Sequence, residues 1–320
     1  MRVLVTGGAG YIGSVCAEEL LRQGHEVVVI DDLSTGRRKA VPDGAEFYKY
    51  HIADPSVMRL MKNGKPFDVV FHFAARALVG ESMDDPSDYY YNNLQASMYL
   101  IEMVREAGIE RFVFSSSCAV YGITVVPITE EGHKEPANPY GETKLAFERL
   151  LQWYAKAYKL SVCSFRYFNA AGATKTHGED HKPETHIIPL LLEVAAGERE
   201  SFTINGAYYP TVDGTCVRDY VHVLDIAHAH ILALQNLDSP GFSVYNIGTG
   251  VGFSVYEVLT LVRDITERPI PFKYGPRRDG DPAILYASPK ILMSELGWKP
   301  QYSSLDNIIE TAWKWKMRNK

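Results

Sequence analysis

Short apolar runs alternate with helical patterns through the first half of this 320-residue sequence, and this rhythm limits the fold more than any other feature. The runs are rich in Val, Ile and Phe, and they occupy residues 2–6, 26–30, 47–50, 69–73, 112–115 and 162–165. Strands that alternate with helices in this way are typical of successive βαβ units. We therefore predict an α/β fold built on a doubly wound parallel sheet.

The rhythm is lost after residue 167, where Gly, Pro and short strands separate helical patterns at 187–196, 221–235 and 304–315. This change indicates a smaller mixed α/β domain that closes over the carboxyl edge of the sheet, where such folds bind ligands. We predict a nucleotide-binding domain at residues 1–167, with a return segment near 221–248, and a substrate domain at residues 168–320.

Composition excludes several classes of protein. The formal net charge is −6, and no basic run is present that could follow a nucleic-acid backbone. The four cysteines are widely spaced without a CxxC pair, so they indicate neither a zinc site nor a disulfide framework. No apolar run approaches the roughly 18 residues of a membrane span, and we expect no removable leader before the first strand. We expect a cytoplasmic protein without a metal, nucleic-acid or membrane partner.

Three glycines mark a candidate phosphate-binding turn. Gly7, Gly10 and Gly13 are spaced as GxxGxxG between the first strand and a helix that begins near Gly13. Without side chains, the backbone can turn sharply and approach a pyrophosphate, while the helix directs its unpaired N–H groups at that charge. The sequence therefore predicts a Rossmann-like dinucleotide site.

An acidic residue indicates which dinucleotide this site takes. Asp31 ends the second strand, about 20 residues beyond the glycines, where a carboxylate accepts hydrogen bonds from ribose hydroxyls and repels a 2′-phosphate. Arg37 and Arg38 lie close enough to neutralise such a phosphate, although a solvated basic loop explains them better. We predict NAD rather than NADP as the cofactor.

A tyrosine and a lysine form the candidate catalytic pair. Tyr140 and Lys144 are one helical turn apart, so their side chains share a face of the predicted helix. A free phenol titrates near pH 10, and a neighbouring ammonium and a positive nicotinamide both lower that pKa. The strand at 112–115 leads to Ser117 at the carboxyl edge of the sheet. We predict Tyr140 as the general base, Lys144 as its activator and Ser117 as the group that holds the reacting hydroxyl.

The motifs that surround these residues resemble a known family. They include GGAGYIGS at 7–14, SSSCAVYG at 115–122, YGETK at 140–144, RYFNAAGA at 166–173 and GTCVRDYVHVLD at 214–225. Together they resemble the UDP-glucose 4-epimerase family of the extended short-chain dehydrogenase/reductase superfamily, over nearly the whole chain. The resemblance implies an isomerase of galactose metabolism that interconverts UDP-galactose and UDP-glucose through a transient 4-keto sugar. It also implies a retained NAD and a homodimer formed by helices near 92–107 and 144–158.

The same resemblance assigns further site residues. Beside the three glycines, Asp31 and the catalytic pair, the residues expected to contact NAD are Tyr11, Ile12, Ser34, Ile52, Phe73, Ala74 and Asn92. The residues expected to bind the UDP-sugar, beside Ser117 and Tyr140, are Asn169, His186, Asn205, Arg218, Arg278, Asp281 and Leu285. Within this set the two arginines and Asn169 are expected at the phosphates, and Asp281 at the uridine ribose.

The sequence leaves the range of substrates open, and two other functions are weighed against the 4-epimerase. Leu285 stands where side-chain size is expected to govern access of N-acetylated sugars, and leucine is neither small nor aromatic. A 4-epimerase of UDP-N-acetylhexosamine or of a UDP-pentose therefore stays open. A 4,6-dehydratase is disfavoured because Cys118 and Ala119, rather than an acidic pair, follow Ser117. A non-catalytic NAD-binding regulator is disfavoured because Tyr140 is present.

Overall fold

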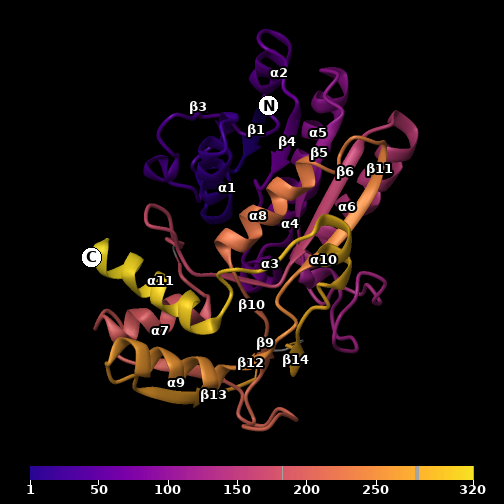
Figure 1. Ribbon diagram of the computed structural model, residues 1–320. Coiled ribbons are helices and arrows are strands. Elements are labelled where there is room, and N and C mark those ends of the chain that lie inside the picture. The colour runs from indigo at the N-terminus through magenta and orange to yellow at the C-terminus, as the bar shows by residue number, and fades with distance from the viewer. Residues whose placement is uncertain (182, 278–280, 320) are drawn as a thin grey trace.

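A seven-stranded parallel sheet forms the centre of the structure, a computed structural model that describes residues 1–181, 183–277 and 281–319 (Figure 1). Its strand order is β11-β6-β5-β4-β1-β2-β3, and each neighbouring pair runs parallel. The strands are β1 (Arg2–Thr6), β2 (Glu26–Ile30), β3 (Glu46–Tyr48), β4 (Val69–His72), β5 (Arg111–Ser117), β6 (Ser161–Tyr167) and β11 (Gly241–Ile247). The predicted doubly wound fold is confirmed.

The direction of winding reverses beside β1. The chain moves outward from β1 through β2 and β3, and then returns to place β4 on the other side of β1. In doubly wound sheets, ligands bind at the carboxyl ends of the strands where this reversal opens a crevice. The turn that follows β1 carries the three glycines, so the topology places them at the expected ligand crevice.

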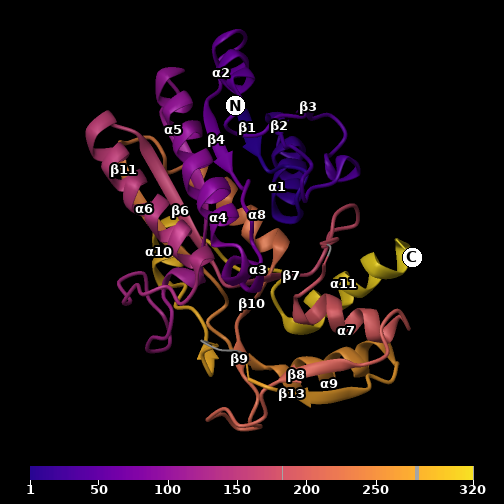
Figure 2. The ribbon, with the colours of Figure 1, turned by 180° about the vertical axis from the view of Figure 1, so that it is seen from behind.

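Alternation along β1 divides the core into two layers. Val3 and Val5 pack into one hydrophobic cluster and Leu4 into the other, as the period of two in a strand requires. The first layer is covered by α1 (Tyr11–Arg22), α8 (Val223–Leu234) and α10 (Lys290–Leu296). The second is covered by α2 (Pro55–Lys62), α5 (Ala96–Glu106) and α6 (Pro139–Tyr158), which face the viewer in Figure 2. Burial on both faces explains why β1 reads as a continuous apolar run.

A late part of the chain completes this sheet. Helix α8 packs beside α1, and β11 pairs with β6 along its whole length, from Gly241 opposite Ser161 to Ile247 opposite Tyr167. Both elements lie within the segment predicted to return to the nucleotide-binding region, whereas the exact limits of the two domains stay a prediction. The helix predicted to start at residue 221 begins at Val223, because the preceding residues form a short strand.

A smaller region with its own hydrophobic core lies beyond the carboxyl edge of the sheet (Figures 1 and 2). Its helices are α7 (Ile187–Ala195), α9 (Val255–Thr266) and α11 (Leu305–Arg318). Its strands are β7 (Asn169–Ala171), β8 (Phe202–Asn205), β9 (Val217–Arg218), β10 (Tyr220–His222), β12 (Phe253–Ser254), β13 (Phe272–Gly275) and β14 (Ile284–Leu285). They form the small sheets β10-β7, β12-β9-β14 and β13-β8, which agrees with the predicted mixed α/β region.

The remaining elements are short and lie between the strands and their covering helices. They are η1 (Arg38–Ala40), α3 (Val79–Asp84), α4 (Pro86–Tyr89), the π-helical turn η2 (Tyr90–Gln95) and η3 (Cys118–Val120). Within the described ranges, no helix combines the length and the apolar character that crossing a bilayer requires. The four cysteines, Cys16, Cys118, Cys163 and Cys216, are free.

Candidate functional site

The glycine turn after β1 is built by close contacts of its backbone. Gly7 has a φ of +73°, and a Cβ placed on it would lie 2.5 Å from the backbone nitrogen of Ala74. A Cβ on Gly13 would lie 2.3 Å from the carbonyl oxygen of Gly7. Neither neighbour is a flexible side-chain end, so both positions exclude larger residues. These two glycines therefore bring α1 close to the ends of β1 and β4.

The third glycine of the turn faces a different environment. A Cβ on Gly10 would meet only the Gly7 carbonyl oxygen, at 3.3 Å, so packing of the protein itself does not demand glycine there as strongly. Gly10 is also the N-cap of α1, where no side chain caps the helix and no acidic residue occupies the first turn. An uncapped helix start attracts an anion through its N–H groups and dipole. The chain thus offers the cradle that a pyrophosphate needs.

Asp31 lies at the carboxyl end of β2 and joins two loops. Its carboxylate accepts hydrogen bonds from the backbone N–H of Ala9, at 3.0 Å, and of Leu33, at 2.8 Å. Burial raises the pKa of Asp31, and these two bonds oppose that rise. A carboxylate has further lone pairs, so it can still accept from ribose hydroxyls. The bond to Ala9 is a second role for this residue, which fixes the glycine turn, and it has no signature in the sequence.

The other residues expected at NAD come from several elements. Tyr11, in the first turn of α1, donates its hydroxyl hydrogen to the Gly172 carbonyl oxygen at 2.6 Å, and this bond ties α1 to the smaller region. Asn92 lies in the π-helical turn, where its amide donates to Asp88. Ile12, Phe73 and Ala74 are half-buried around the turn, Ile52 is buried and Ser34 is exposed. Their contacts with the cofactor remain predictions.

Helix α6 starts where it brings Tyr140 beside Ser117. Asn138 caps the helix through its side-chain oxygen, which accepts from the N–H of Gly141 at 2.9 Å. A Cβ on Gly141 would lie 2.4 Å from the carbonyl oxygen of Ala119, so the first turn packs directly on the loop that follows β5. Ser117 is the last residue of β5, and its side chain interacts with that of Tyr140. The sheet edge and the helix start thus assemble the predicted pair.

Burial sets the protonation of this pair. Burial raises the pKa of Tyr140 to about 12, against the opposing hydrogen bond from Ser117. Burial also lowers the pKa of Lys144 to about 7, while Glu148 one turn further along the helix opposes that change. The Lys144 ammonium donates to the Ser115 carbonyl oxygen at 2.8 Å. Without cofactor, Tyr140 therefore holds its proton, and its activation needs an added positive charge nearby.

Beneath the catalytic helix lies a buried network that the sequence analysis missed. Arg166 on β6 donates to Glu148 through Nε, at 3.0 Å, and through Nη2, at 2.6 Å. It also donates to the Tyr121 hydroxyl at 2.7 Å and to the Glu130 carbonyl oxygen at 3.1 Å. These residues are distant in sequence, and only the paired strands and helix bring them together. The network fixes α6 against β6, so it positions Lys144 indirectly.

Two residues expected at opposite parts of the nucleotide lie in direct contact. Arg218 donates to the carboxylate of Asp281, and it also donates to the Val217 carbonyl oxygen at 2.6 Å. Asp281 further accepts from the Tyr209 hydroxyl at 3.3 Å. The predicted phosphate ligand Arg278 lies outside the described residues. The Arg218 guanidinium must therefore divide its donors between Asp281 and any phosphate that binds here.

The remaining residues expected at the substrate lie in the smaller region or at its border. Leu285 on β14 is paired with Arg218 on β9, so the two side chains lie next to each other on the same side of this small sheet. The Asn169 amide donates to the Asp219 carbonyl oxygen at 2.8 Å. Asn205 ends β8. His186 immediately precedes α7 and forms ion pairs with Glu179 and Glu184.

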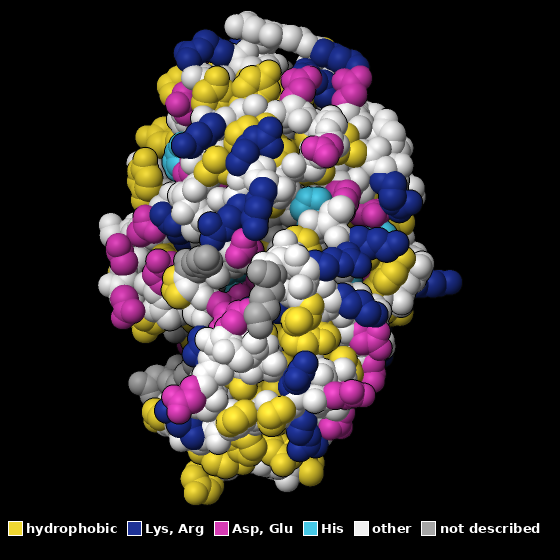
Figure 3. All heavy atoms as spheres, turned by 90° about the vertical axis from the view of Figure 1, so that its left-hand side faces the viewer, with side chains coloured by type: hydrophobic (Ala, Val, Ile, Leu, Met, Phe, Trp, Pro, Cys, Tyr) yellow, Lys and Arg dark blue, Asp and Glu magenta, His cyan; other side chains and the backbone are white. Residues whose placement is uncertain are grey.

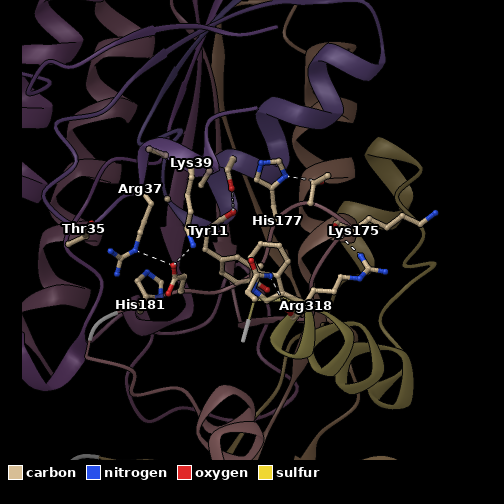
Figure 4. A pocket seen from close by; sticks show the side chains of 17 residues that line it. Tyr11, Thr35, Arg37, Lys39, Lys175, His177, His181 and Arg318 are labelled. Atoms are coloured by element: carbon tan, nitrogen blue, oxygen red, sulfur yellow. Dashed lines mark hydrogen bonds and ion pairs between the residues drawn. The ribbon is translucent and has the colours of Figure 1, made fainter. Parts of the chain in front are cut away.

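A cavity of about 330 Å³ opens beside the glycine turn. Gly10 and Tyr11 line it, together with the loop around residues 35–40, the loop around 175–181 and the end of α11 (Figure 4). Basic side chains gather across this face (Figure 3), and Lys39, Lys175 and Arg318 are among those that line the cavity. The cavity borders the predicted pyrophosphate site but includes none of the three predicted catalytic residues.

Fold and site together define an α/β enzyme with a dinucleotide turn and a Ser-Tyr-Lys arrangement at the carboxyl edge of its sheet. Residues 3–248 match the model of the NAD dependent epimerase/dehydratase family. The chain belongs to this family, which confirms the predicted resemblance and the predicted dependence on NAD.

Known relatives and solved structures agree with this assignment. The chain is 49% identical to a UDP-glucose 4-epimerase of Lacticaseibacillus casei, over 98% of this chain and 96% of that protein. It is similar to a crystal structure of a UDP-glucose 4-epimerase, with a TM-score of 0.96, 46% identity and coverage of 99% and 98%. A Bifidobacterium longum UDP-glucose 4-epimerase solved with NAD⁺ and UDP gives a TM-score of 0.95, with 35% identity and coverage of 100% and 99%.

Proposed function

We propose that the protein is a UDP-glucose 4-epimerase, which interconverts UDP-galactose and UDP-glucose through a transient 4-keto sugar. The observation that carries the proposal is the placement of Tyr140 against Ser117, with Lys144 one turn away, at the sheet edge that also bears the glycine turn. Relatives named UDP-glucose 4-epimerase match nearly the whole chain, and this supports the proposed reaction.

The chain's own residues divide the chemistry as follows. NAD, when bound, supplies the acceptor and later the donor of the hydride at C4 of the sugar. Ser117 holds the sugar 4-hydroxyl, and Tyr140 takes its proton and afterwards returns it. Because burial holds the pKa of Tyr140 near 12, proton transfer becomes efficient only once positive charge stands beside the phenol. Activation of the base is thereby coupled to cofactor binding.

The protein must bind the UDP part of the substrate tightly, because the keto sugar has to rotate within the site while UDP stays bound. Arg218 is well placed for this role: its side chain is mostly buried, and its planar guanidinium suits bidentate contact with phosphate. Asp281 positions that guanidinium and offers acceptors to the uridine ribose. Asn169 and Arg278 are proposed as further phosphate contacts.

The sugar part of the substrate has to rotate, so we assign it to residues that would bind it only weakly. Leu285 neighbours the proposed phosphate ligand Arg218 and packs partly against a buried cluster that includes Val120 and Phe168. We assign it to the hexose pocket, together with His186 and Asn205. Its size leaves UDP-N-acetylhexosamines and UDP-pentoses as alternative substrates.

We further propose that two copies associate through α5 and α6. These adjacent helices expose large aromatic side chains to solvent: Tyr99 is 55% exposed, Trp153 67% and Tyr158 50%. Packing in the core of a single chain does not account for these exposed residues, whereas an interface between paired helices does. A cytoplasmic location and a place in galactose metabolism complete the proposal.

The decisive experiment mixes the purified protein with UDP-galactose, without added NAD, and follows UDP-glucose by chromatography. Parallel samples contain UDP-N-acetylgalactosamine or a UDP-pentose. We expect conversion of UDP-galactose, and we expect Tyr140→Phe to reduce kcat by about 10²–10⁴-fold while the protein still contains NAD. Tyr274→Phe, an exposed tyrosine far along the chain, serves as the control.

The alternative functions give different results in the same assay. Conversion of only the acetylated or pentose substrate would move the assignment to those sugars. A protein that retains NAD but converts none of the substrates, even with NAD supplied, would favour the regulator. Near-normal turnover by Tyr140→Phe would remove Tyr140 from the mechanism.

A further inference from the structure

Two glutamates and two histidines converge in the segment between β7 and α7. Glu179, His181, Glu184 and His186 follow the pattern Glu-x-His-x-x-Glu-x-His, and the donor atoms of their side chains converge. One donor atom from each lies within 4.8 Å of the donor atoms of the other three. This convergence is not explained by the proposed epimerase chemistry, which needs at most one of the four.

The spacing of these atoms is close to that of a metal site. Nδ1 of His186 lies 2.8 Å from Glu179 and 2.9 Å from Glu184, and Nδ1 of His181 lies 2.9 Å from Glu179. With metal–ligand bonds of about 2.0–2.1 Å, ligand atoms in a tetrahedral site lie about 3.3–3.4 Å apart. Replacing the shared protons by one cation therefore requires these three contacts to widen by about half an ångström, while donor atoms that now lie up to 4.8 Å apart move closer together.

The charges around the cluster also favour a cation. Both glutamate side chains are 8% exposed, so two acidic groups lie together with little access to water. The nearest basic residues of the loop around 35–40 are engaged elsewhere: Arg37 and Lys39 pair with Asp180, at 3.2 and 3.4 Å (Figure 4). Among the described residues, the ion pairs of Glu179 and Glu184 are with the two imidazoles alone.

We propose that Glu179, His181, Glu184 and His186 bind one divalent transition-metal cation of the Zn²⁺ class. Two imidazole nitrogens and two carboxylate oxygens form a ligand set that suits Zn²⁺ and its first-row neighbours, whereas Mg²⁺ and Ca²⁺ prefer oxygen alone. The spacing of the cysteines predicted no metal site, but no cysteine belongs to this cluster.

Such a cation fixes the segment that leads into α7. His186 is the residue immediately before this helix, so one bond to the metal fixes the start of α7 relative to the loop. His181 also lines the cavity that Gly10 and Tyr11 border, so the cluster lies at the edge of the dinucleotide turn (Figure 4). The proposed role is therefore structural, a clamp beside the dinucleotide turn, and it does not depend on the identity of the sugar substrate.

The test measures metal binding directly on the full-length protein with its cofactor. After treatment with a chelator and its removal, the protein is dialysed against Zn²⁺ and bound metal is counted by mass spectrometry. Dialysis against Co²⁺ adds a spectroscopic readout, because tetrahedral Co²⁺ with nitrogen and oxygen ligands absorbs visible light strongly. We expect one Zn²⁺ per chain and a tetrahedral Co²⁺ spectrum.

Variants separate this site from adventitious binding. His181→Gln and Glu184→Gln each remove one ligand, and each should weaken Zn²⁺ binding by about 100-fold or more, since even loss of a residue behind a ligand costs 10–100-fold. His177→Gln is the matched control: it lies in the same loop, but its imidazole pairs with Glu18 outside the cluster. The control should bind Zn²⁺ like the unaltered protein.

Other outcomes overturn the proposal. It fails if the unaltered protein binds less than one Zn²⁺ per chain, or if His177→Gln weakens binding as much as His181→Gln. It also fails if the two ligand variants bind metal normally. Circular dichroism and NAD content of each variant establish that it is folded, and epimerase turnover is scored separately, so failure of the metal site and failure of the proposed function remain distinguishable.

Discussion

The buried Arg166–Glu148 pair gives the sharpest prediction for stability. Their side chains are 2% and 1% exposed, so each charge is stabilised by the other and by the surrounding hydrogen bonds rather than by water. Arg166→Met leaves the Glu148 carboxylate buried without its cation. Breaking a buried pair in this way costs about 3–5 kcal/mol, a large share of the 5–15 kcal/mol that stabilises a typical protein.

A variant in which both partners are replaced shows whether an unpaired charge or lost packing causes the destabilisation. In the double variant Arg166→Met/Glu148→Leu no unpaired charge remains, and apolar replacement of a buried pair is often nearly neutral. We therefore expect the double variant to be more stable than Arg166→Met by about 2 kcal/mol or more. Arg149→Met is the control, since Arg149 neighbours Glu148 on α6 but is exposed, and it should change stability by less than about 0.5 kcal/mol.

Urea denaturation at constant, saturating NAD measures these differences, because a ligand that binds the folded state adds to its apparent stability. The reasoning is refuted if Arg166→Met costs less than about 1 kcal/mol. It is also refuted if the double variant is less stable than the single one, because the cost would then arise from lost packing. A further consequence concerns Lys144: Glu148 raises its pKa, so the double variant should lower that pKa below about 7.

Three further predictions concern the cofactor turn and the catalytic lysine. Between about pH 7 and pH 10, Lys144 binds its proton in the unfolded chain but not in the folded one, because burial lowers its folded pKa to about 7. The free energy of unfolding should therefore rise with pH relative to Lys144→Met, by up to about 1.4 kcal/mol per unit, and parallel stability curves would contradict this. Gly13→Ala should abolish NAD retention, because the new Cβ falls 2.3 Å from the Gly7 carbonyl oxygen, whereas Gly80→Ala meets no atom within 4 Å and should retain NAD. Asp31→Ala should weaken binding of NAD more than that of NADP in a fluorescence titration, and an unchanged preference would mean that another group reads the ribose.

The fold was predictable where local pattern and final environment agree. The run at 26–30 is a strand with those same limits, because all of its apolar residues are buried by helices on both faces of the sheet. The strands β9, β12 and β14 were not located individually, since two residues are too short to show a period of two. Their pairing depends on loops that tertiary structure brings together.

The site was predictable to the extent that its chemistry lies in short motifs. Tyr140 and Lys144 are one helical turn apart, so spacing alone places them together. The hydrogen bond between Ala9 and Asp31 and the network around Arg166 join residues that are 18 or more positions apart in the sequence. No local sequence pattern indicates such contacts. The pairing of Arg218 with Asp281 is equally non-local, since 63 positions separate the two residues.

The place of β11 in the sheet has a consequence for how the chain is synthesised. A nascent chain that has reached residue 167 contains six of the seven strands but presents β6 as an edge, with its backbone groups unpaired on one side. That edge stays open until residues 241–247 have left the ribosome, about 75 residues later, or several seconds at typical rates of synthesis. The sheet of the nucleotide-binding half therefore stays incomplete while residues 168–240, which include only the first part of the smaller region, are synthesised. During that time the open edge of β6 could pair with another chain.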